Sequence, residues 1–487
     1  MTDVVAEAAA AHPEGEAWRD LGAGGVLTLG RWDADANRMA RGLRAAGVGP
    51  GDRVVLGIGP EHPFPWLVTY VAVHRAGAAA VPVSTRLAAA ELRAVEQHAE
   101  AALVVDTGGA GGDHAVGSGS GGRRAEWDTL LDDDPSPLPW PAPADRAVDV
   151  MYTSGTTGTP KAVVARAGSA QPRGRPARWN GLGFLTCSPF STTSGILLVD
   201  GPVRSGMSGW YLPRFDPGHW LELVEQERPV AAFLVPAMAQ LLVAHPRFAE
   251  ADLRSLAALT FGGAPVPRAT LVRLAERLEG AEVFVGYGLT EFGAVSRTPA
   301  GDQGRHLGSV GTPLEGVEVR VVGEDGAERD RGQVGEVTVR GPLPPRHYFK
   351  DEAATGRTWR DGWLHTGDLG YLDADGFLWI TGRAKDVIIR GGNNIVPRDV
   401  EEVLFAHPDV VDAVVVGIPH DVLGEDVATW IVLRDHATVT ADDVRAFLGE
   451  RLADYKVPRT VHFVPELPRN ASGKVVPSKL RGQEPRP

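Results

Sequence analysis

The run YTSGTTGTPK, residues 152–161, gathers the residue types that can hold a chain of phosphates. Its glycines let the backbone turn tightly and direct successive N–H groups toward one point, and its hydroxyls add further donors. Lys161 closes the run with a mobile positive charge. The alternative interpretation is a polar surface turn. The density of donors and the closing lysine favour a polyphosphate site.

Two further glycine-rich stretches, GGAP at 262–265 and GYGLTE at 286–291, each follow an apolar run. This order predicts that both lie at the carboxyl ends of strands, where open α/β sheets bind ligands. Glycines there let a flat ring approach the backbone, Tyr287 can cover the ring, and Glu291 can hold Mg²⁺ through oxygen. Alone, each stretch would be a weak signal, because glycines at strand ends more often form ordinary turns. In order with the threonine-rich loop, they predict a nucleotide site.

The elements that must position these loops alternate between apolar runs and helical patterns, which predicts a layered α/β core. DPGHWLELVEQERP at 216–229 precedes the strand-like VAAFLVP, and we expect Asp216 to cap that helix with Pro217 in its first turn. ATLVRLAERLEG likewise predicts a helix before Gly280. The following AEVFVGYG is expected to be a buried strand.

Further along the chain the pattern changes twice. From about residue 310, short strands and turns predict a small barrel or meander. After GRAKD at 382–386, a compact region with its own helices and strands predicts a second domain. The segment 107–122 has almost nothing to bury and is expected to be a mobile loop.

The composition excludes several classes of protein. A chain of 487 residues with 43% hydrophobic content can bury two or more cores. Its net charge of -13 argues against a nucleic-acid surface. The single cysteine, Cys187, excludes an internal disulfide and is expected to be a small buried hydrophobe. Without a basic leader or a run of ~18 apolar residues, we expect a cytoplasmic protein with no membrane partner.

Together these motifs resemble those of the adenylate-forming (AMP-binding) superfamily, which includes acyl-CoA synthetases, peptide-synthetase adenylation domains and firefly-type luciferases. YTSGTTGTPK resembles the phosphate loop of that superfamily, and GGAP and GYGLTE resemble its adenine and magnesium stations. TGD at 366–368 and GR at 382–383 resemble its ribose contacts. RGGNNIVPRDVEEVL and PRNASGKV extend the match over nearly the whole chain.

The resemblance implies a fold and a division of the chain. We expect an α/β protein whose large N-terminal domain, residues 1–382, combines layered α/β subdomains with a small β-barrel. A hinge at 383–386, centred on Lys385, leads to a small mobile α+β domain at 387–487. In the family this domain swings between the two halves of the reaction. An exposed linker lysine is the alternative interpretation of Lys385.

The resemblance also implies a two-step reaction that uses ATP, Mg²⁺ and coenzyme A. A carboxylate attacks ATP to give an acyl adenylate and pyrophosphate, and a thiol then displaces AMP. Lys474 would reach the α-phosphate, Asp368 and Arg383 would bind the ribose hydroxyls, and Gly391 and Gly392 would line a tunnel for the pantetheine arm. As a solvated lysine near the end of the chain, Lys474 would otherwise be unremarkable.

Residue by residue, the implied roles are as follows. The catalytic residues are Lys161, Thr290, Glu291 and Lys474, with Glu291 also the metal ligand. The nucleotide-binding residues are Thr153, Ser154, Gly155, Thr156, Thr157, Gly158, Gly263, Ala264, Pro265, Gly286, Tyr287, Gly288, Asp368 and Arg383. The acyl-pocket residues are Thr192, Thr193, Ser194, Gly195 and Leu289.

The segment GFLTCSPFSTTSGILLV at 183–199 occupies the position of the family's acyl pocket and contains no Asp or Glu. An amino-acid substrate would need a buried carboxylate for its ammonium, so such a substrate is disfavoured. The small residues leave room for a bulky, largely apolar acid, although an ordinary polar turn explains them nearly as well. Because no carrier-like domain is appended, free CoA is the favoured acceptor. The identity of the acid stays open, as do a separate carrier protein and a homodimer.

Three departures from the family pattern border the expected triphosphate or carboxylate. Thr192 stands where acyl-CoA ligases carry a histidine, Ala162 replaces a glycine, and prolines interrupt 165–181. Harmless drift is one explanation; the other is an enzyme specialised for thioester formation from acyl-AMP, with weak or absent adenylation. An adenylate-forming oxygenase and a non-catalytic nucleotide-binding relic are further alternatives. Retention of the five charged site residues argues against the relic: Lys161, Glu291, Asp368, Arg383 and Lys474.

Overall fold

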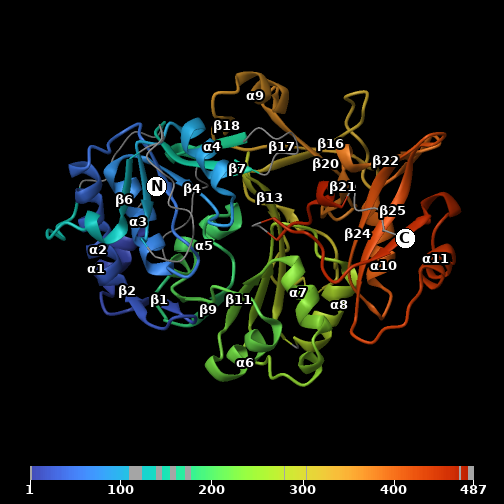
Figure 1. Cartoon of the computed structure of the whole chain (residues 1–487), viewed down its shortest axis with the longest axis horizontal. Coiled ribbons are helices and arrows are strands. Elements are labelled where there is room, and N and C mark those ends of the chain that lie inside the picture. Colours follow the sequence, from blue (N-terminus) through green and yellow to red (C-terminus); the bar gives the residue numbers. More distant parts are fainter. Residues whose placement is uncertain are drawn as a thin grey trace.

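A computed structural model of the chain describes residues 3–108, 123–138, 145–153, 161–169, 177–278, 280–302, 304–470 and 473–480. Its strands form four sheets, three in the larger N-terminal part and one in the C-terminal part (Figure 1). Nearly all of the segment expected to be a mobile loop, 107–122, lies outside the described residues. Within the described ranges, no helix has the length and apolar character needed to cross a bilayer.

The first sheet has seven strands in the order β18-β8-β7-β4-β3-β5-β6. Their bounds are β3 Arg53–Leu56, β4 Ala79–Pro82, β5 Leu103–Asp106, β6 Arg123–Glu126, β7 Ala147–Thr153, β8 Lys161–Arg166 and β18 His347–Tyr348. Strands β7, β4, β3, β5 and β6 pair in parallel, whereas β8 and β18 add an antiparallel edge. The accompanying helices are α1 Val4–Ala11, α2 Leu29–Ala45, α3 Pro63–Ala76 and α4 Ala89–Ala99.

The second sheet has nine strands in the order β15-β14-β13-β12-β11-β9-β10-β1-β2. Their bounds are β1 Glu16–Asp20, β2 Val26–Thr28, β9 Gly183–Thr186, β10 Ser208–Tyr211, β11 Ala231–Leu234, β12 Ala258–Phe261, β13 Glu282–Leu289, β14 Gly293–Arg297 and β15 Thr312–Pro313. The helices between these strands are α5 Thr193–Arg204, α6 Pro217–Glu227, α7 Pro236–Ala244 and α8 Arg268–Arg277. The alternation of helices and strands predicted from the sequence is confirmed.

Local details of this sheet test the sequence predictions. Asp216 caps α6, because its Oδ1 accepts a hydrogen bond of 2.8 Å from the amide of His219. The prediction that β13 is a buried strand was wrong, since Val285 alone is buried in it. The reason is that β13 pairs in parallel with β12 only as far as Val285, and then pairs with β14 in an antiparallel way from Gly286. Cys187 is buried as expected, and burial raises the pKa of its thiol.

The third sheet is antiparallel and contains β16 Glu318–Val322, β17 Gly335–Arg340, β19 Trp359–Arg360, β20 Trp363–Leu372 and β21 Leu378–Arg383. These are the short strands that predicted a barrel or meander. The helix α9 Glu352–Thr358 lies beside it, in the stretch before β19. Strand β20 pairs with both β17 and β21, which places its central residues inside the sheet.

The chain leaves β21, passes through a short 3-10 turn at Ala384–Asp386, and enters the C-terminal part. This part holds β22 Ile388–Arg390, β23 Asn393–Ile395, β24 Val410–His420, β25 Gly424–Leu433, β26 Thr460–Phe463, α10 Pro397–Phe405 and α11 Ala441–Gly449. It has its own hydrophobic core, which includes Ile395, Leu404 and Ile431. Hydrogen bonds join this part to the larger part. Glu402 accepts one of 3.0 Å from the amide of Arg268, and Arg434 donates one of 2.8 Å to the carbonyl of Ala244.

Candidate active site

The phosphate-loop motif connects two neighbouring antiparallel strands. Thr153 ends β7, Lys161 begins β8, and the two residues are partners in the strand register. The loop between them, which contains Ser154, Gly155, Thr156, Thr157 and Gly158, lies outside the described residues. Lys161 is half-buried at the strand end. The strands therefore bring both ends of the motif to one edge of the first sheet.

The two glycine-rich stretches lie side by side at the ends of β12 and β13. GGAP follows β12 directly, and Gly263 has a φ of +87°, a conformation that L side chains rarely adopt. The GYGL part of the second motif lies within β13, not after it. A Cβ on Gly288 would come within 2.5 Å of the carbonyl oxygen of Gly293, so the antiparallel pairing with β14 requires glycine there.

Asp368 lies at the centre of a polar network that joins the second and third sheets. Tyr287 donates to its Oδ2 at 2.6 Å, and Arg383 donates to its Oδ1 at 2.7 Å. Asp368 and Arg383 are register partners on β20 and β21, while Tyr287 comes from β13. Burial, together with the charge and the hydrogen bond of Asp368, raises the pKa of the Tyr287 hydroxyl. The phenol is therefore held as a neutral donor.

Glu291 and Thr290 are held by residues that the sequence did not single out. Tyr348 donates a hydrogen bond of 2.8 Å to Oε1 of Glu291, and Arg346 donates one of 2.8 Å to the carbonyl of Thr290. The hydroxyls of Thr290 and Thr193 are 2.8 Å apart. Tyr348 belongs to β18, which pairs with β8 beside the phosphate-loop motif. Only this pairing, and no sequence motif, places it beside Glu291.

Glu291 fits a magnesium ion that is bound mainly through a substrate. Within the described residues, no cluster of three or more His, Cys, Asp or Glu side chains could hold a metal ion alone. Mg²⁺ is commonly bound by one or two carboxylates together with substrate phosphates and water. A single carboxylate beside a phosphate-loop motif matches that donor set.

Lys474 comes from the C-terminal part and reaches the same place. Its side chain keeps an exposed surface, yet the surrounding protein withdraws enough water to lower its pKa. The positive charges of Arg383 and Lys385 lower this pKa further, whereas Asp368 and Glu291 oppose the shift. Beside Lys474, the Cβ position of Gly473 is 3.3 Å from Val235 Cγ2. Figure 1 shows this last segment of the chain extending from the C-terminal part toward α7 and β13.

Gly391 and Gly392 lie elsewhere, on the exposed turn between β22 and β23. Their φ values of +57° and +85° both favour glycine. Leu423 of the same part neighbours Gly391, and no described residue lies within 4 Å of the Cβ position of Gly392. The structure thus brings Lys474 together with the nucleotide-site candidates and leaves the glycine pair on the surface of the C-terminal part.

The predicted acyl segment forms the start of α5. Thr192 is the N-cap, with its hydroxyl accepting from the amide of Gly195 at 3.0 Å and donating to the carbonyl of Pro189 at 2.9 Å. A Cβ on Gly195 would come within 2.0 Å of the Pro189 oxygen. Ser194 Oγ is 3.5 Å from the Cβ position of Gly263. The segment therefore packs against the GGAP motif at 262–265.

An apolar cluster follows this helix start, and the sequence assigned only part of it to the site. Leu198 packs with Phe233 and Val235, and Phe184 and Met238 lie against them. The Cβ position of Gly262 is 3.4 Å from the Phe233 ring. Phe184 and Leu198 lie within the predicted acyl segment at 183–199, whereas Phe233 and Val235 belong to the VAAFLVP strand, which the sequence did not assign to the site.

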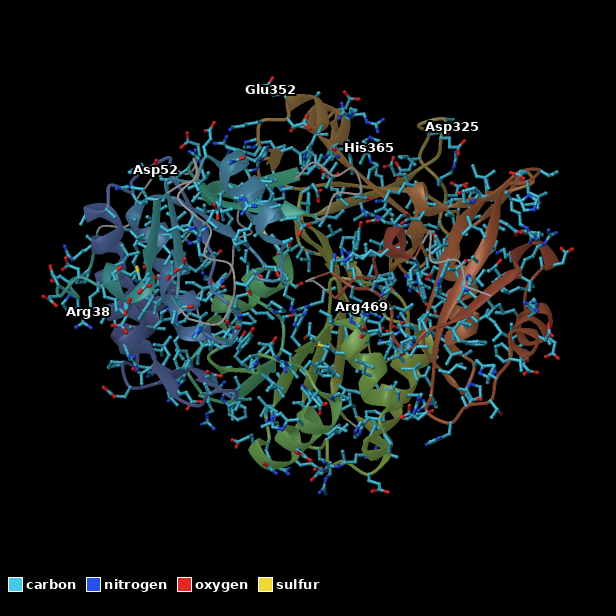
Figure 2. All side chains as sticks on the ribbon, in the orientation of Figure 1. Arg38, Asp52, Asp325, Glu352, His365 and Arg469 are labelled. Carbon is cyan, nitrogen blue, oxygen red and sulfur yellow. The ribbon has the colours of Figure 1, made fainter. Side chains whose placement is uncertain are left out.

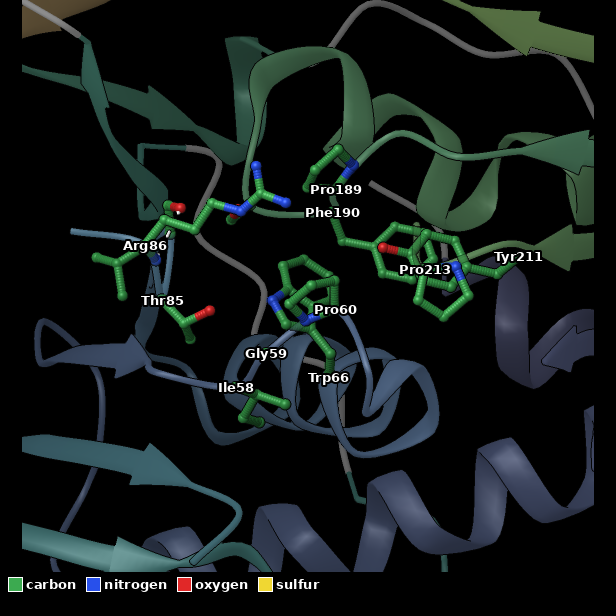
Figure 3. Close-up of a pocket in the computed structure, with 13 residues that line it drawn as sticks. Ile58, Gly59, Pro60, Trp66, Thr85, Arg86, Pro189, Phe190, Tyr211 and Pro213 are labelled. Carbon is green, nitrogen blue, oxygen red and sulfur yellow. Dashed lines mark hydrogen bonds between the residues drawn. The ribbon is translucent and has the colours of Figure 1, made fainter. Parts of the chain in front are cut away.

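A narrow pocket between the two larger sheets adjoins the same segment at Ser191 (Figure 3). Figure 3 shows Arg86 extending over one side of the pocket, with Phe190 and Tyr211 closing the other. The rings of Phe190 and Tyr211 stack with their centroids 4.6 Å apart. Arg86 is the one charged residue among the described residues that line this pocket.

Comparison with known proteins places this geometry in a family. The family model for "AMP-binding enzyme" matches residues 5–349, and that for the "AMP-binding enzyme C-terminal domain" matches residues 399–474. The chain belongs to the AMP-binding enzyme family. The matched ranges include Lys161, Glu291 and Lys474.

Relatives within the family cover almost the whole chain. The chain is 36% identical over 479 residues to feruloyl-CoA synthase from Amycolatopsis sp, covering 94% of each protein. It is 33% identical over 479 residues to long-chain-fatty-acid–CoA ligase FadD13 from Mycobacterium tuberculosis, covering 94% of this chain and 93% of the relative. The solved structure of o-succinylbenzoate CoA synthetase from Bacillus subtilis, in complex with its acyl-adenylate intermediate, superimposes with a TM-score of 0.84. Its sequence identity is 28%, and the match covers 100% of this chain and 99% of that one.

These findings confirm the predicted superfamily and its acyl-CoA ligase branch, and with them an AMP-forming acid–CoA ligase. They also confirm the α/β fold with a large N-terminal and a small C-terminal domain. The domain boundaries and the roles of individual residues remain predictions.

Proposed function

We propose that this member of the AMP-binding enzyme family activates a bulky, largely apolar carboxylic acid as its acyl adenylate and transfers the acyl group to coenzyme A. The observation that carries the proposal is the convergence of Lys474 with Asp368, Arg383 and Glu291, residues that come from three separate segments of the chain. A protein that only bound a nucleotide would have no need for a lysine brought to the site from the C-terminal part.

In the first half-reaction, a carboxylate oxygen of the acid attacks the α-phosphorus of ATP and pyrophosphate leaves. The ammonium of Lys474 stabilises the charge that builds on the α-phosphate oxygens. Lys161 and the donors of the phosphate loop neutralise the departing pyrophosphate. When bound through Glu291, Mg²⁺ would supply further positive charge at the phosphates.

The Asp368 network orients the nucleotide in this proposal. One ribose hydroxyl donates to the Asp368 carboxylate, and Arg383 donates to the ribose oxygens. Tyr287 covers the adenine ring while its hydroxyl fixes the carboxylate. Gly263, Ala264 and Pro265, with Gly286 and Gly288, let the ring approach the backbone closely.

In the second half-reaction, the CoA sulfur attacks the acyl carbonyl and AMP leaves as the C–O bond to phosphate breaks. We assign the hinge to residues 383–386, with Lys385 at its centre, between domains at 1–382 and 387–487. Rotation about this hinge would remove Lys474 and bring Gly391 and Gly392 to the site, where they would line the path of the pantetheine arm.

The acid is assigned to the part of the site that is formed by Thr193, Ser194 and the apolar cluster of Leu198, Phe233 and Val235. The three residues of that cluster are buried and apolar, which suits an uncharged acyl body. Two relatives act, by name, on ferulate and on long-chain fatty acids, both of which carry a large apolar body. We propose an aromatic or comparably bulky acid, with Leu289 at the edge of the site.

A second candidate function is thioester formation alone, from acyl-AMP made elsewhere. One observation favours it. Thr192 stands where related ligases carry a histidine, and its hydroxyl is already used to cap α5, so it cannot replace that histidine. Against it stands Lys474, which has a use only in adenylation.

One experiment separates these functions. Carboxylic acids are screened with ATP and CoA for thioester formation by mass spectrometry, and each active acid is assayed for pyrophosphate release. The same acid, supplied as preformed acyl-AMP, is then assayed for thioester formation. Comparable rates support the two-step ligase; thioester formation without pyrophosphate release supports the specialised enzyme. No thioester from any acid or adenylate would contradict both.

A further inference from the structure

Arg469 joins the hairpin that carries Lys474 to the C-terminal sheet, and Val475 of the same hairpin packs against the apolar core on β24 and β25. The described residues of this hairpin, 469–470 and 473–475, are called the Lys474 hairpin. Arg469 and Val475 form an antiparallel β-bridge. The amide of Asn470 donates to the carbonyl of Lys474 at 2.9 Å, and the amide of Gly473 donates to the carbonyl of Asn470 at 3.0 Å. The side chain of Asn470 also accepts from the Lys474 amide at 3.0 Å.

The guanidinium of Arg469 donates hydrogen bonds to two acceptors. Nη1 donates to the carbonyl of Gly473 at 2.6 Å, directly before Lys474. Nη2 donates to Oδ2 of Asp412 on β24, in an ion pair whose side chains are 26% and 14% exposed for Arg469 and Asp412. The other carboxylate oxygen of Asp412 accepts from the amide of Ala413 at 3.0 Å. The carboxylate is thus held by its own strand, and it holds the arginine.

The position of Lys474 needs such an anchor. Its ammonium lies in the field of two cations, Arg383 and Lys385, as well as two carboxylates. Removal of water from the ammonium and repulsion from the cations together outweigh the attraction of the carboxylates, so they oppose holding the charged lysine in the site. Figure 2 shows Arg469 near the middle of the molecule, between the larger part and the C-terminal part.

We propose that Asp412 and Arg469 are positioning residues for adenylate formation, which act by holding the Lys474 hairpin in the geometry that presents its ammonium to the α-phosphate. A planar, forked guanidinium can join a carboxylate and a peptide oxygen in fixed directions, which a lysine cannot do. This inference rests on the proposed two-step function. In this proposal the pair does not contact the substrate and takes no part in thioester formation.

The test compares Arg469→Gln and Asp412→Asn with the wild-type enzyme in each half-reaction. Pyrophosphate release from acid plus ATP should fall roughly 10- to 100-fold, the loss expected when a catalytic group is displaced by about 1 Å. The KM for ATP and thioester formation from preformed acyl-AMP should be unchanged. Equal losses in both half-reactions, or pyrophosphate release at the wild-type rate, would overturn the proposal.

Two further variants separate positioning from simple support of the fold. Arg469→Lys keeps the positive charge beside Asp412 but loses the hydrogen bond to the carbonyl of Gly473. Compared with Arg469→Gln, it should therefore have a melting temperature closer to that of the wild-type enzyme, without a recovery of adenylation. In a Lys474→Ala background, Arg469→Gln should cause no further loss of adenylation, because its effect passes through Lys474. Arg445→Gln removes an ion pair with Asp442 on α11, involves a partly exposed side chain, and serves as the matched control.

Hydrogen exchange tests the anchor without any acid. The amides of Gly473 and Lys474 should exchange faster in Arg469→Gln than in the wild-type protein, because both are bonded within the hairpin. If no acid is activated by the wild-type enzyme, the proposed function fails while this measurement still decides the anchor. Unchanged exchange at both amides would refute the anchor itself.

Discussion

Tyr287 and Asp368, which are 81 residues apart in the chain, are joined by a hydrogen bond of 2.6 Å. This bond connects the side chain expected to cover the adenine ring with the carboxylate expected to bind the ribose. Since Arg383 occupies the other oxygen of Asp368, the two predicted ribose residues and the predicted adenine residue form one unit. A change in any of them should therefore affect nucleotide binding.

The first prediction concerns that unit. Asp368→Ala should weaken the binding of AMP by about 1.5–3 kcal/mol, the range for a lost hydrogen bond to a charged group. Tyr287→Phe keeps the ring and the carboxylate, so it should weaken binding less. Titration calorimetry with AMP measures both variants. If Asp368→Ala binds AMP like the wild-type protein, Asp368 is not in the ribose site.

The second prediction separates the two faces of the C-terminal part. Lys474→Ala should nearly abolish pyrophosphate release and spare thioester formation from acyl-AMP, whereas Gly392→Leu should do the reverse. The space beside Gly392 is open in this structure, so a leucine there should not hinder adenylation.

Gly326 offers a control for the backbone strain of Gly392→Leu. It has a φ of +75° and open space around it on a surface turn, so Gly326→Leu should leave both half-reactions unchanged. Equal slowing of both half-reactions by Lys474→Ala and by Gly392→Leu would contradict the proposed rotation of the domain.

The third prediction is a pH dependence. Removal of water by the surrounding protein lowers the pKa of Lys474, and the neighbouring cations lower it further, so its ammonium is lost at a lower pH than that of a fully solvated lysine. Adenylation needs the charged form and should therefore fall as pH rises through this lowered pKa. Lys474→Arg stays charged and should move the alkaline limb of the pyrophosphate-release profile to higher pH. An alkaline limb at the same pH in both enzymes would assign it to another group.

The fourth prediction concerns Tyr348, whose hydroxyl donates to Glu291. Tyr348→Phe should leave the carboxylate less well oriented and raise the Mg²⁺ concentration needed for half-maximal pyrophosphate release several-fold. Mn²⁺ binding to the ATP complex, followed by electron paramagnetic resonance, should weaken in parallel. Tyr371→Phe alters a tyrosine of the third sheet and provides a control. An unchanged metal dependence would leave Tyr348 with a purely structural role.

The fifth prediction tests the packing at the start of α5. Gly195→Ala would place a methyl group 2.0 Å from the carbonyl oxygen of Pro189 and should destabilise the protein by about 1–3 kcal/mol. Gly201 lies in the same helix, and beyond that helix no described residue comes within 4 Å of its Cβ position, so Gly201→Ala should stabilise the protein by about 0.5–1 kcal/mol. Thermal unfolding measures both. Equal effects of the two substitutions would show that α5 does not pack as described.

The sequence by itself determined the features that depend on neighbours in the chain. The order of the glycine-rich motifs identified the family, Asp216 and Pro217 predicted the start of α6, and the buried state of Cys187 followed from its type. Such features are local because caps, turns and motifs involve residues only a few positions apart.

Only the tertiary structure decided which distant residues meet. The partners of Glu291, Asp368 and Lys474 depend on the pairing of β18 with β8, of β20 with β21, and of the Lys474 hairpin with Asp412. Strand pairing over long separations is set by the packing of whole sheets, and local propensities are largely the same whichever partner a strand finds. The wrong prediction for β13 has the same cause. The sequence showed the apolar start of this strand, but it did not show that the strand changes its pairing partner at Gly286.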